Sequence, residues 1–427
     1  MASTQAAAPS GSSYIGPMIM IGVLFFIMGF FTWLNGPLTI FVKLAFSLDD
    51  VSAFLIPVAF YLSYFILALP SAAILKRTGM KRGMALGLFV MAIGAVMFGE
   101  FINLRNYHGA LVGLFVIGAG LSLLQTSSNP YISILGPIDS AAQRIAFMGI
   151  CNKFAGFLAP LVFGALVLSG IDTLDQQVKA APTLAARDAL LNGFAARVYS
   201  PYMAMAAVLV VLAIWVVRST LPEIKPAGAN DEHTIGHTGR SIFSFPHLWL
   251  GVLCLFVYVG VEVMAGDAIG IYGQGLGLPL DATKHFTAYT MFAMLLGYIV
   301  GLALIPRFVS QQRYLAVSAV LGVLLTVGAY ATTGYASVTF VASLGFANAM
   351  MWPAIFPLAI KGLGSHTEVG SAFLIMGIVG GALIPQVFVH LKEAINFQLA
   401  FLLVIVPCYL YILYYGLRGH HVGQRAG

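Results

Sequence analysis

Charged side chains inside long apolar segments are the first candidates for chemistry in this sequence. Lys153 stands about ten residues into the apolar stretch 144–169, roughly 15 Å deep and near the midplane of a bilayer. Glu262 stands in the middle of the stretch 246–273. A charge at the centre of a membrane helix costs about 2.5–3.5 kcal/mol, so such residues are functional candidates by default. We expect Lys153 and Glu262 to form a pair whose carboxylate takes up and releases a proton; an ion pair that only fixes helix packing is the alternative.

A second carboxylate, Asp267, follows Glu262 by five residues. On a helix of 3.6 residues per turn this spacing is a rotation of about 140°, so the two carboxylates cannot share one tight face. We group Asp267 with the proton-coupling residues. Because it stands closer to the end of the stretch, a role as a gate or at a helix end is as consistent with its position as contact with a ligand.

Uncharged polar and aromatic side chains form a second set of candidates. Amides donate and accept hydrogen bonds at once, as do the hydroxyls of a sugar, and aromatic rings can stack on the apolar face of a pyranose. Such rings are also common in the packing of membrane helices, which is their alternative role. The predicted ligand-binding residues are Asn35, Gln125, Asn129, Asn152 and Asn348, with Trp33, Tyr258 and Trp352.

The composition places these residues in a membrane. Of the 427 residues, 60% are hydrophobic and only 8% are Asp, Glu, Lys or Arg, against about 25% in a soluble domain. All three cysteines fall inside apolar runs, so the sequence offers no disulfide framework, and we expect no metal site and no cofactor apart from a co-transported proton or sodium ion. The predicted transmembrane helices are 17–41, 51–75, 84–104, 109–134, 144–169, 200–218, 246–273, 285–305, 314–332, 337–361, 368–390 and 396–417.

The distribution of positive charge predicts the orientation. With both termini in the cytoplasm, 13 of the 21 Lys and Arg residues fall on the cytoplasmic side, as the positive-inside rule requires. Basic turns follow the second and eighth helices, and we expect Arg77, Arg82 and Arg307 there to take part in gating. The predicted divisions are a tail at 1–16, a six-helix half at 17–218, a cytoplasmic linker at 219–245, a second six-helix half at 246–417 and a tail at 418–427.

The two halves repeat each other in sequence. Gly156–Phe163 reads GFLAPLVF and Gly381–Phe388 reads GALIPQVF, an offset of 225 residues; Gln125–Pro130 and Asn348–Pro353 match at an offset of 223. Two parallel six-helix repeats with a substrate site between them near the midplane form the architecture of major facilitator transporters. The predicted fold is therefore an all-α membrane protein of twelve transmembrane helices in two pseudo-symmetric halves. The sequences around Asn35–Pro37 and Asn129–Pro130 also predict helix breaks.

Several of these strings resemble one branch of that superfamily, the fucose, galactose and glucose permeases. The matching strings are Leu34–Leu38, Ala59–Phe65, Gln125–Tyr131, Val257–Gly260 and Trp352–Phe356. Within the branch, Thr32–Gly36, Met148–Gly156 and Tyr258–Asp267 are most similar to bacterial N-acetylglucosamine permeases. Fucose permeases carry proton-coupling and sugar-binding carboxylates where this chain has Gly36 and Gln125, which directs the search for a titrating group to Glu262 with Lys153.

The resemblance implies a secondary active transporter of the bacterial inner membrane that imports a hexose-type sugar, N-acetylglucosamine above all, by proton symport with alternating access. Alternatives are transport of glucose, galactose or fucose, coupling to sodium, uniport, or a lipid or drug transporter of the same fold. We do not expect an enzyme, because the histidines lie in loops or near helix ends and no phosphate-binding loop occurs. The expected partners are a small sugar and the lipid bilayer, with no nucleic acid, and the protein is expected to act as a monomer.

Overall fold

The computed structural model describes residues 15–134, 141–222, 241–305 and 307–423. The predicted tail 1–16 and the predicted linker 219–245 lie for the most part outside the described residues, and the predicted tail 418–427 is described to Gly423. The N-terminal half consists of α1 (Ile15–Thr32), α2 (Asn35–Ala45), α3 (Asp50–Ala53), α4 (Leu55–Thr78), α5 (Met80–Asn103), α6 (Tyr107–Ile134), α7 (Ala141–Leu166), α8 (Ile171–Ala180), α9 (Leu184–Ala196) and α10 (Tyr199–Arg218).

The C-terminal half consists of α11 (Pro246–Gly266), α12 (Ile269–Gly275), α13 (Leu280–Thr283), α14 (Phe286–Leu304), α15 (Gln311–Ala331), α16 (Gly334–Asn348), α17 (Met351–Ile360), α18 (Thr367–Met376), α19 (Gly380–Ala394) and α20 (Phe397–Leu417). Short 3₁₀ segments are η2 (Ile242–Ser244), η3 (Gly364–His366), η4 (Gly377–Val379) and η5 (Gly419–His421). Twelve stretches are long and apolar enough to cross a bilayer, and the described residues contain no strand. The predicted fold class is confirmed.

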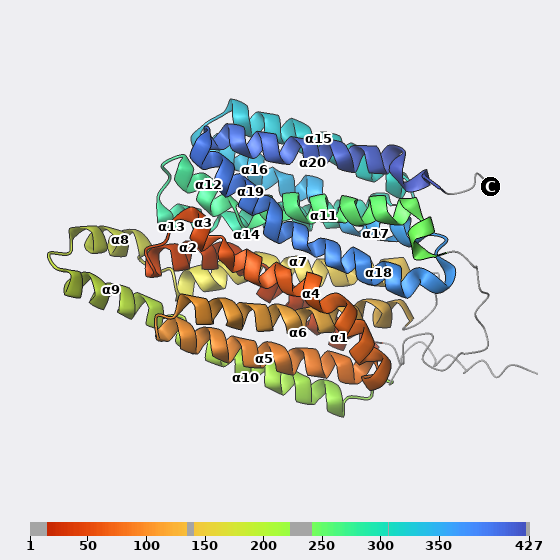
Figure 1. The fold of residues 1–427 in the computed structure, drawn as a ribbon, viewed down its shortest axis with the longest axis horizontal. Helices are drawn as coiled ribbons and strands as arrows, with labels where there is room; N and C mark the ends of the chain where they lie inside the picture. The colour runs from red at the N-terminus through yellow and green to blue at the C-terminus, as the bar shows by residue number, and fades with distance from the viewer. Residues whose placement is uncertain (1–14, 135–140, 223–240, 306, 424–427) are drawn as a thin grey trace, which may run out of the picture.

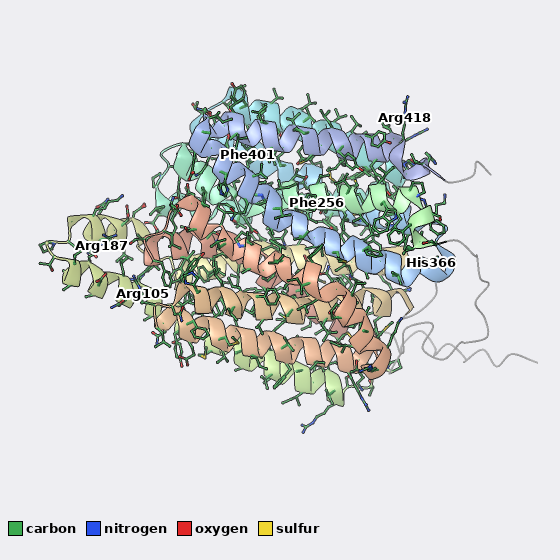
Figure 2. The ribbon with its side chains drawn as sticks, in the orientation of Figure 1. Arg105, Arg187, Phe256, His366, Phe401 and Arg418 are labelled. Atoms are coloured by element: carbon green, nitrogen blue, oxygen red, sulfur yellow. The ribbon has the colours of Figure 1, made fainter. Side chains whose placement is uncertain are left out.

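The helices run side by side along the long axis of the molecule, with the N-terminal half on one side and the C-terminal half on the other (Figure 1). We call the end where α10 ends and α11 begins the linker end. The opposite end carries α8 and α9, and we call it the hairpin end. Side chains of Arg105 and Arg187 lie at the hairpin end and Arg418 at the linker end, whereas Phe256 lies between them (Figure 2). Charge at both ends of an apolar bundle is what a membrane-spanning protein requires.

Proline sets two of the helix breaks that shape the centre of the bundle. A proline lacks an N–H and clashes with the carbonyl four residues earlier. Pro37 is four residues after Trp33, where α1 gives way to α2, and Pro353 is four residues after Ala349, where α16 gives way to α17. The predicted break near Asn35–Pro37 is confirmed. The predicted break at Asn129–Pro130 is wrong, because α6 continues through it to Ile134; prolines are tolerated in membrane helices when neighbours compensate.

Other predicted helices are also interrupted where the sequence suggested continuity; one of them is 368–390, which η4 divides into α18 and α19. The predicted helix 246–273 ends as α11 at Gly266 and resumes as α12 at Ile269, and the predicted helix 337–361 is divided between α16 and α17. Met350, at the second break, has φ of 61°, a backbone conformation that non-glycine residues rarely adopt. Strained, broken helices at the centre of a bundle are typical of transporters, in which they surround a binding site.

Glycines allow several pairs of helices to touch backbone to backbone, and three of these contacts lie between α1 and α7, α14 and α16, and α11 and α19. A Cβ atom added at Gly29 of α1 would meet the backbone of Asn152 in α7, one at Gly345 of α16 would meet Thr290 in α14, and one at Gly380 of α19 would meet Phe256 in α11. In a membrane no hydrophobic force drives helices together, so close packing through small residues takes its place. The first of these contacts positions α7, which carries Lys153.

Candidate functional site

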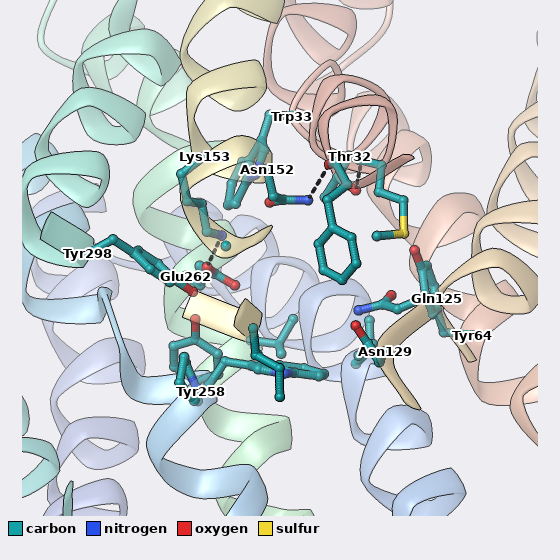
Figure 3. Close-up of a pocket in the computed structure, with 18 of the residues that line it drawn as sticks. Thr32, Trp33, Tyr64, Gln125, Asn129, Asn152, Lys153, Tyr258, Glu262 and Tyr298 are labelled. Atoms are coloured by element: carbon teal, nitrogen blue, oxygen red, sulfur yellow. Dashed lines mark hydrogen bonds and ion pairs between the residues drawn. The ribbon is translucent and has the colours of Figure 1, made fainter. Parts of the chain in front are cut away.

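A cavity of about 140 Å³ lies between the two halves, about ten times the 10–15 Å³ that one water needs. Helices of both halves line it, and polar side chains from α1, α6, α7 and α11 converge there (Figure 3). Eight predicted site residues line this cavity: Trp33, Gln125, Asn129, Asn152, Lys153, Tyr258, Glu262 and Trp352. The structure therefore brings together residues separated by up to 319 positions (352 − 33) in the chain.

The ion pair at the cavity joins the two halves. Lys153 Nζ of α7 lies 2.8 Å from Glu262 Oε1 of α11, and the two side chains are only 9% and 10% exposed. The ammonium group also lies 4.7 Å from the centre of the Trp33 ring and 5.9 Å from that of Tyr298, within the range of cation–π attraction. Among the residues that line the cavity, these are the only two charged groups, so the formal charges of the lining cancel.

Two glycines of α7 make room for the rings that surround Lys153. A Cβ at Gly149 would come within 2.7 Å of the Tyr298 ring, and a Cβ at Gly156 would strike the Trp33 ring. Trp33 is almost fully buried, and its Nε1 has no hydrogen-bond partner among the described residues. The lysine ammonium therefore lies near the rings of Trp33 and Tyr298 and pairs with Glu262.

The amides of α6 lie in the part of the cavity nearer the linker end, and the amide of α7, Asn152, lies next to Lys153 in the sequence. Gln125 and Asn129 are four residues apart on α6, so they lie on the same helix face, and Figure 3 shows both facing the cavity beside Tyr64. Asn152 of α7 donates from Nδ2 to the backbone oxygen of Phe25 at 3.2 Å. An apolar and aromatic pocket with a few placed polar groups is the usual form of a small-molecule site.

Two predicted amides lie elsewhere. Asn35 and Asn348 are fully buried and do not line the cavity. Asn35 Nδ2 donates to the backbone oxygen of Thr32 at 3.1 Å, and Asn348 Oδ1 accepts from the Tyr409 hydroxyl at 2.7 Å. Each therefore stands beside a helix break and bonds to groups of its own half. The predicted gating residues Arg77, Arg82 and Arg307 have exposed side chains and also lie outside the cavity lining.

Three tyrosines that line the cavity were not among the predicted site residues: Tyr61, Tyr64 and Tyr298. Tyr61 and Tyr64 are three residues apart on α4, so they share a face of that helix, and both belong to the string Ala59–Phe65. The three-residue spacing of these two tyrosines is the feature of the sequence that could have identified them as site residues. Asp267 is 1% exposed and lies outside the lining, and Tyr61 links it to the cavity, since the tyrosine hydroxyl donates to Asp267 Oδ2 over 3.4 Å.

The hairpin end of the molecule is closed by contacts between the halves. Asp172 of α8 accepts from the backbone N–H of Leu280 at 2.8 Å and of Asp281 at 3.3 Å, at the start of α13. In return, Lys284 donates to the backbone oxygen of Leu168 at 3.3 Å. The first N–H groups of a helix have no partner within it, so the Asp172 carboxylate satisfies donors of the opposite half.

A second group of polar contacts closes the same end. Asp50, the first residue of α3, forms ion pairs with Lys43 of its own half at 2.6 Å and with Lys392 of the C-terminal half. Lys43 also donates to Gln274 Oε1 of the C-terminal half at 3.1 Å. Since the cavity lining extends in the other direction, to Asn129 near the end of α6, the cavity lies on the linker side of a closed hairpin end.

Removing the Asp172 carboxylate is expected to loosen the hairpin end. A hydrogen bond to a charged group contributes about 1.5–3 kcal/mol, so Asp172→Ala should raise the population with an open hairpin end about tenfold or more. The measurement is the distance distribution between spin labels at Leu104 and Tyr335, two exposed residues of opposite halves at that end. Asp175→Ala is the control, because Asp175 pairs with Lys179 of the same helix; equal distributions for the two variants would contradict the prediction.

Comparison with known proteins agrees with this architecture. Residues 20–385 match the family model of the Major Facilitator Superfamily. The chain is 35% identical over 414 residues to a glucose/galactose transporter of Brucella abortus, covering 96% of this chain and 95% of that one. It is 29% identical over 397 residues to the L-fucose-proton symporter of Escherichia coli, covering 91% and 89%. The crystal structure of the transporter FucP in the outward conformation superposes with a TM-score of 0.75 at 28% identity, covering 95% of this chain and 98% of that one.

The chain therefore belongs to the Major Facilitator Superfamily. Its predicted resemblance to the fucose, galactose and glucose permease branch is confirmed by these relatives, whose names are those of transporters and not of enzymes. Within the described residues no group of three His, Cys, Asp or Glu side chains is placed to hold a metal ion.

Proposed function

We propose that this protein is a secondary active transporter that imports a hexose-type sugar together with a proton. The observation that carries the proposal is the cavity lining, in which the charges of Lys153 and Glu262 cancel and the other polar groups are amides and hydroxyls. Such a lining suits a neutral, polyhydroxylated ligand, because each amide can donate to one hydroxyl and accept from another. The names of the relatives, glucose/galactose transporter and L-fucose-proton symporter, support the same substrate class.

In the proposed mechanism the sugar binds between the halves and the halves rock about it. Gln125, Asn129 and Asn152 bind the hydroxyls, while Trp33, Tyr258 and Trp352 pack against the ring. The ion pair supports coupling, since a carboxylate held by a lysine across the two halves can exchange that lysine for a proton. When Glu262 is protonated the attraction between α7 and α11 weakens, which links the protonation state to the relative position of the halves.

The orientation, the cellular membrane, the oligomeric state and the particular sugar are proposed from the sequence. We propose that the linker end faces the cytoplasm of a bacterial cell, that the protein lies in the inner membrane and that it works as a monomer. N-acetylglucosamine is the substrate that the strings Met148–Gly156 and Tyr258–Asp267 favour, whereas the names of the relatives favour glucose, galactose or fucose. These sugars share a pyranose ring and differ in the identity and stereochemistry of its substituents, so a direct competition among them decides the substrate.

The test is uptake by the purified protein in proteoliposomes. With labelled sugar outside and an imposed inward proton gradient, we expect accumulation above the external concentration, and with a protonophore we expect equilibration only. Unlabelled N-acetylglucosamine, glucose, galactose and fucose are compared as competitors, together with a lipophilic amine as the probe for a drug transporter. An inward sodium gradient at constant pH serves as the control for the coupling ion. Accumulation driven by sodium alone, or competition by the amine alone, would overturn the proposal.

A further inference from the structure

Asp267 is a buried carboxylate without a counter-charge. It lies at the end of α11, is 1% exposed, and its Oδ1 has no hydrogen-bond partner among the described residues. Within the described part of the chain no Lys, Arg or His nitrogen lies within 4.0 Å of the carboxylate. Burial removes the hydration of this carboxylate, and the Tyr61 hydroxyl and the nearby Gly36 N–H offset only part of that loss, so burial favours the neutral acid. Glu262, five residues earlier, differs in having a counter-charge, since Lys153 Nζ lies 2.8 Å from its carboxylate.

The position of Asp267 places it under the closed hairpin end. A Cβ on Gly36 of α2 would come within 3.2 Å of Asp267 Cα and 3.3 Å of Oδ1, so the chains of the two halves are in close contact at this point. Tyr61 of α4 contacts the other oxygen. Both Gly36 and Tyr61 belong to the N-terminal half, whereas Asp267 belongs to the C-terminal half. Separation of the halves at the hairpin end therefore removes the groups that cover Asp267 and admits water.

Resting on the proposed proton symport, we propose that the hairpin end closes only over a protonated Asp267. When the hairpin end is open, Asp267 is hydrated and ionises; closure buries it, so one proton from the solution at that end binds the carboxylate as the halves meet. The Tyr61 ring lines the cavity and its hydroxyl contacts Asp267. Tyr61 thus lies on the route by which the same proton leaves Asp267 for water in the cavity or for Glu262. Loss of that proton leaves Asp267 ionised, and the hairpin end then reopens with Asp267 in this form.

The surroundings of Asp267 contain few groups that could titrate in its place. The acid–base groups that face it are the Tyr61 hydroxyl from α4 and the Glu262 carboxylate from its own helix. The side chain of Lys153 from α7 is paired with Glu262. From α2 the backbone N–H of Gly36 faces the carboxylate, and Thr287 of α14 donates to the backbone oxygen of the neighbouring Gly266; neither residue carries a charge. The pH dependence of closure is therefore assigned to Asp267.

The experiment measures closure directly, without sugar and without a gradient. The full-length protein, with its three cysteines replaced by alanine, carries spin labels at Leu104 and Tyr335, and the ratio of closed to open distances is recorded from pH 5 to pH 9. We expect the ratio to rise as the pH falls, by up to about tenfold per pH unit where one group titrates. Asp267→Asn, whose amide is neutral and nearly isosteric, should remain closed at every pH.

Glu262→Gln is the comparison variant on the same helix: it removes any contribution of the Lys153–Glu262 pair to the relative position of the halves. A rise in closure as the pH falls should remain in this variant, because Asp267 is intact. The proposal is overturned if the labelled parent shows no pH dependence, which needs no variant at all, or if Asp267→Asn keeps the dependence of the parent. It is also overturned if Glu262→Gln alone abolishes the dependence, because the titrating group is then Glu262. Failure of sugar uptake would contradict the proposed function but would leave this measurement interpretable.

Discussion

Glu262→Gln is expected to abolish uphill accumulation of sugar while exchange of sugar across the membrane continues. The glutamine has the shape of the glutamate and can still accept from Lys153 Nζ, which lies 2.8 Å from the native carboxylate, but it cannot bind and release a proton at physiological pH. In proteoliposomes with an imposed proton gradient, the ratio of internal to external sugar should fall to about one. Counterflow of labelled sugar into vesicles loaded with unlabelled sugar should remain close to the rate of the unaltered protein.

A matched control for this substitution is Glu100→Gln. Glu100 lies near the end of α5, where it accepts a hydrogen bond from Tyr199 of the same half at 3.1 Å, and it lies outside the cavity lining. Accumulation should persist in this variant. If accumulation also persists in Glu262→Gln, the coupling proton binds elsewhere; if both accumulation and counterflow are lost, Glu262 serves sugar binding or folding and not coupling.

Lys153→Met is expected to destabilise the protein strongly, and a second substitution should reverse the effect. Removing one partner of a buried ion pair leaves the other charge without compensation and costs roughly 3–5 kcal/mol, whereas replacing both partners by neutral residues is often close to neutral. The thermal unfolding temperature in detergent should therefore drop by several degrees in Lys153→Met and recover in Lys153→Met with Glu262→Gln. Tryptophan fluorescence provides the readout, because Trp33 packs against the lysine.

Lys179→Met is the control variant, because it removes an exposed ion pair that contributes little to the free energy of unfolding. Lys179 pairs with Asp175 at 2.5 Å within α8, and its side chain is 75% exposed, so water and salt screen the interaction. Its unfolding temperature should stay near that of the unaltered protein. An equal loss of stability in Lys153→Met and in the double variant would contradict the prediction, since the cost would then come from lost packing of the lysine stem and not from the unpaired carboxylate.

Composition and spacing were sufficient to predict the fold class. Water cannot solvate a chain with 8% charged residues, and a helix satisfies every backbone group within a bilayer, so the number of apolar segments fixed the number of spans. The same scarcity of charge singled out Lys153 and Glu262, because the cost of burying each one limits such residues to positions with a partner or a role. The structure places these two side chains together, although 109 residues separate them.

Sequence patterns did not determine which amides face the cavity. Gln125 and Asn152 line it, whereas Asn35 and Asn348 are buried against their own halves. A helix of a soluble protein reveals its inward face by the contrast between apolar and polar sides. A membrane helix is apolar toward lipid and toward its neighbours alike, so its sequence leaves the rotation about its axis undefined, and each break, as at Trp33 and Ala349, changes that rotation again.

The contacts between the halves were likewise decided by the tertiary structure. Nothing in the spacing of Asp172 and Leu280, or of Asp50 and Lys392, indicates that each pair meets at the hairpin end. The sequence identifies Asp267 as a costly charge near a helix end. Only the tertiary structure shows that its neighbours are Gly36 and Tyr61 and that, among the described residues, no cation lies beside it. The sequence determined which residues the membrane tolerates only at a cost, because that cost depends on residue type and depth alone; the structure decided what compensates each one, because compensation depends on neighbours brought together by packing.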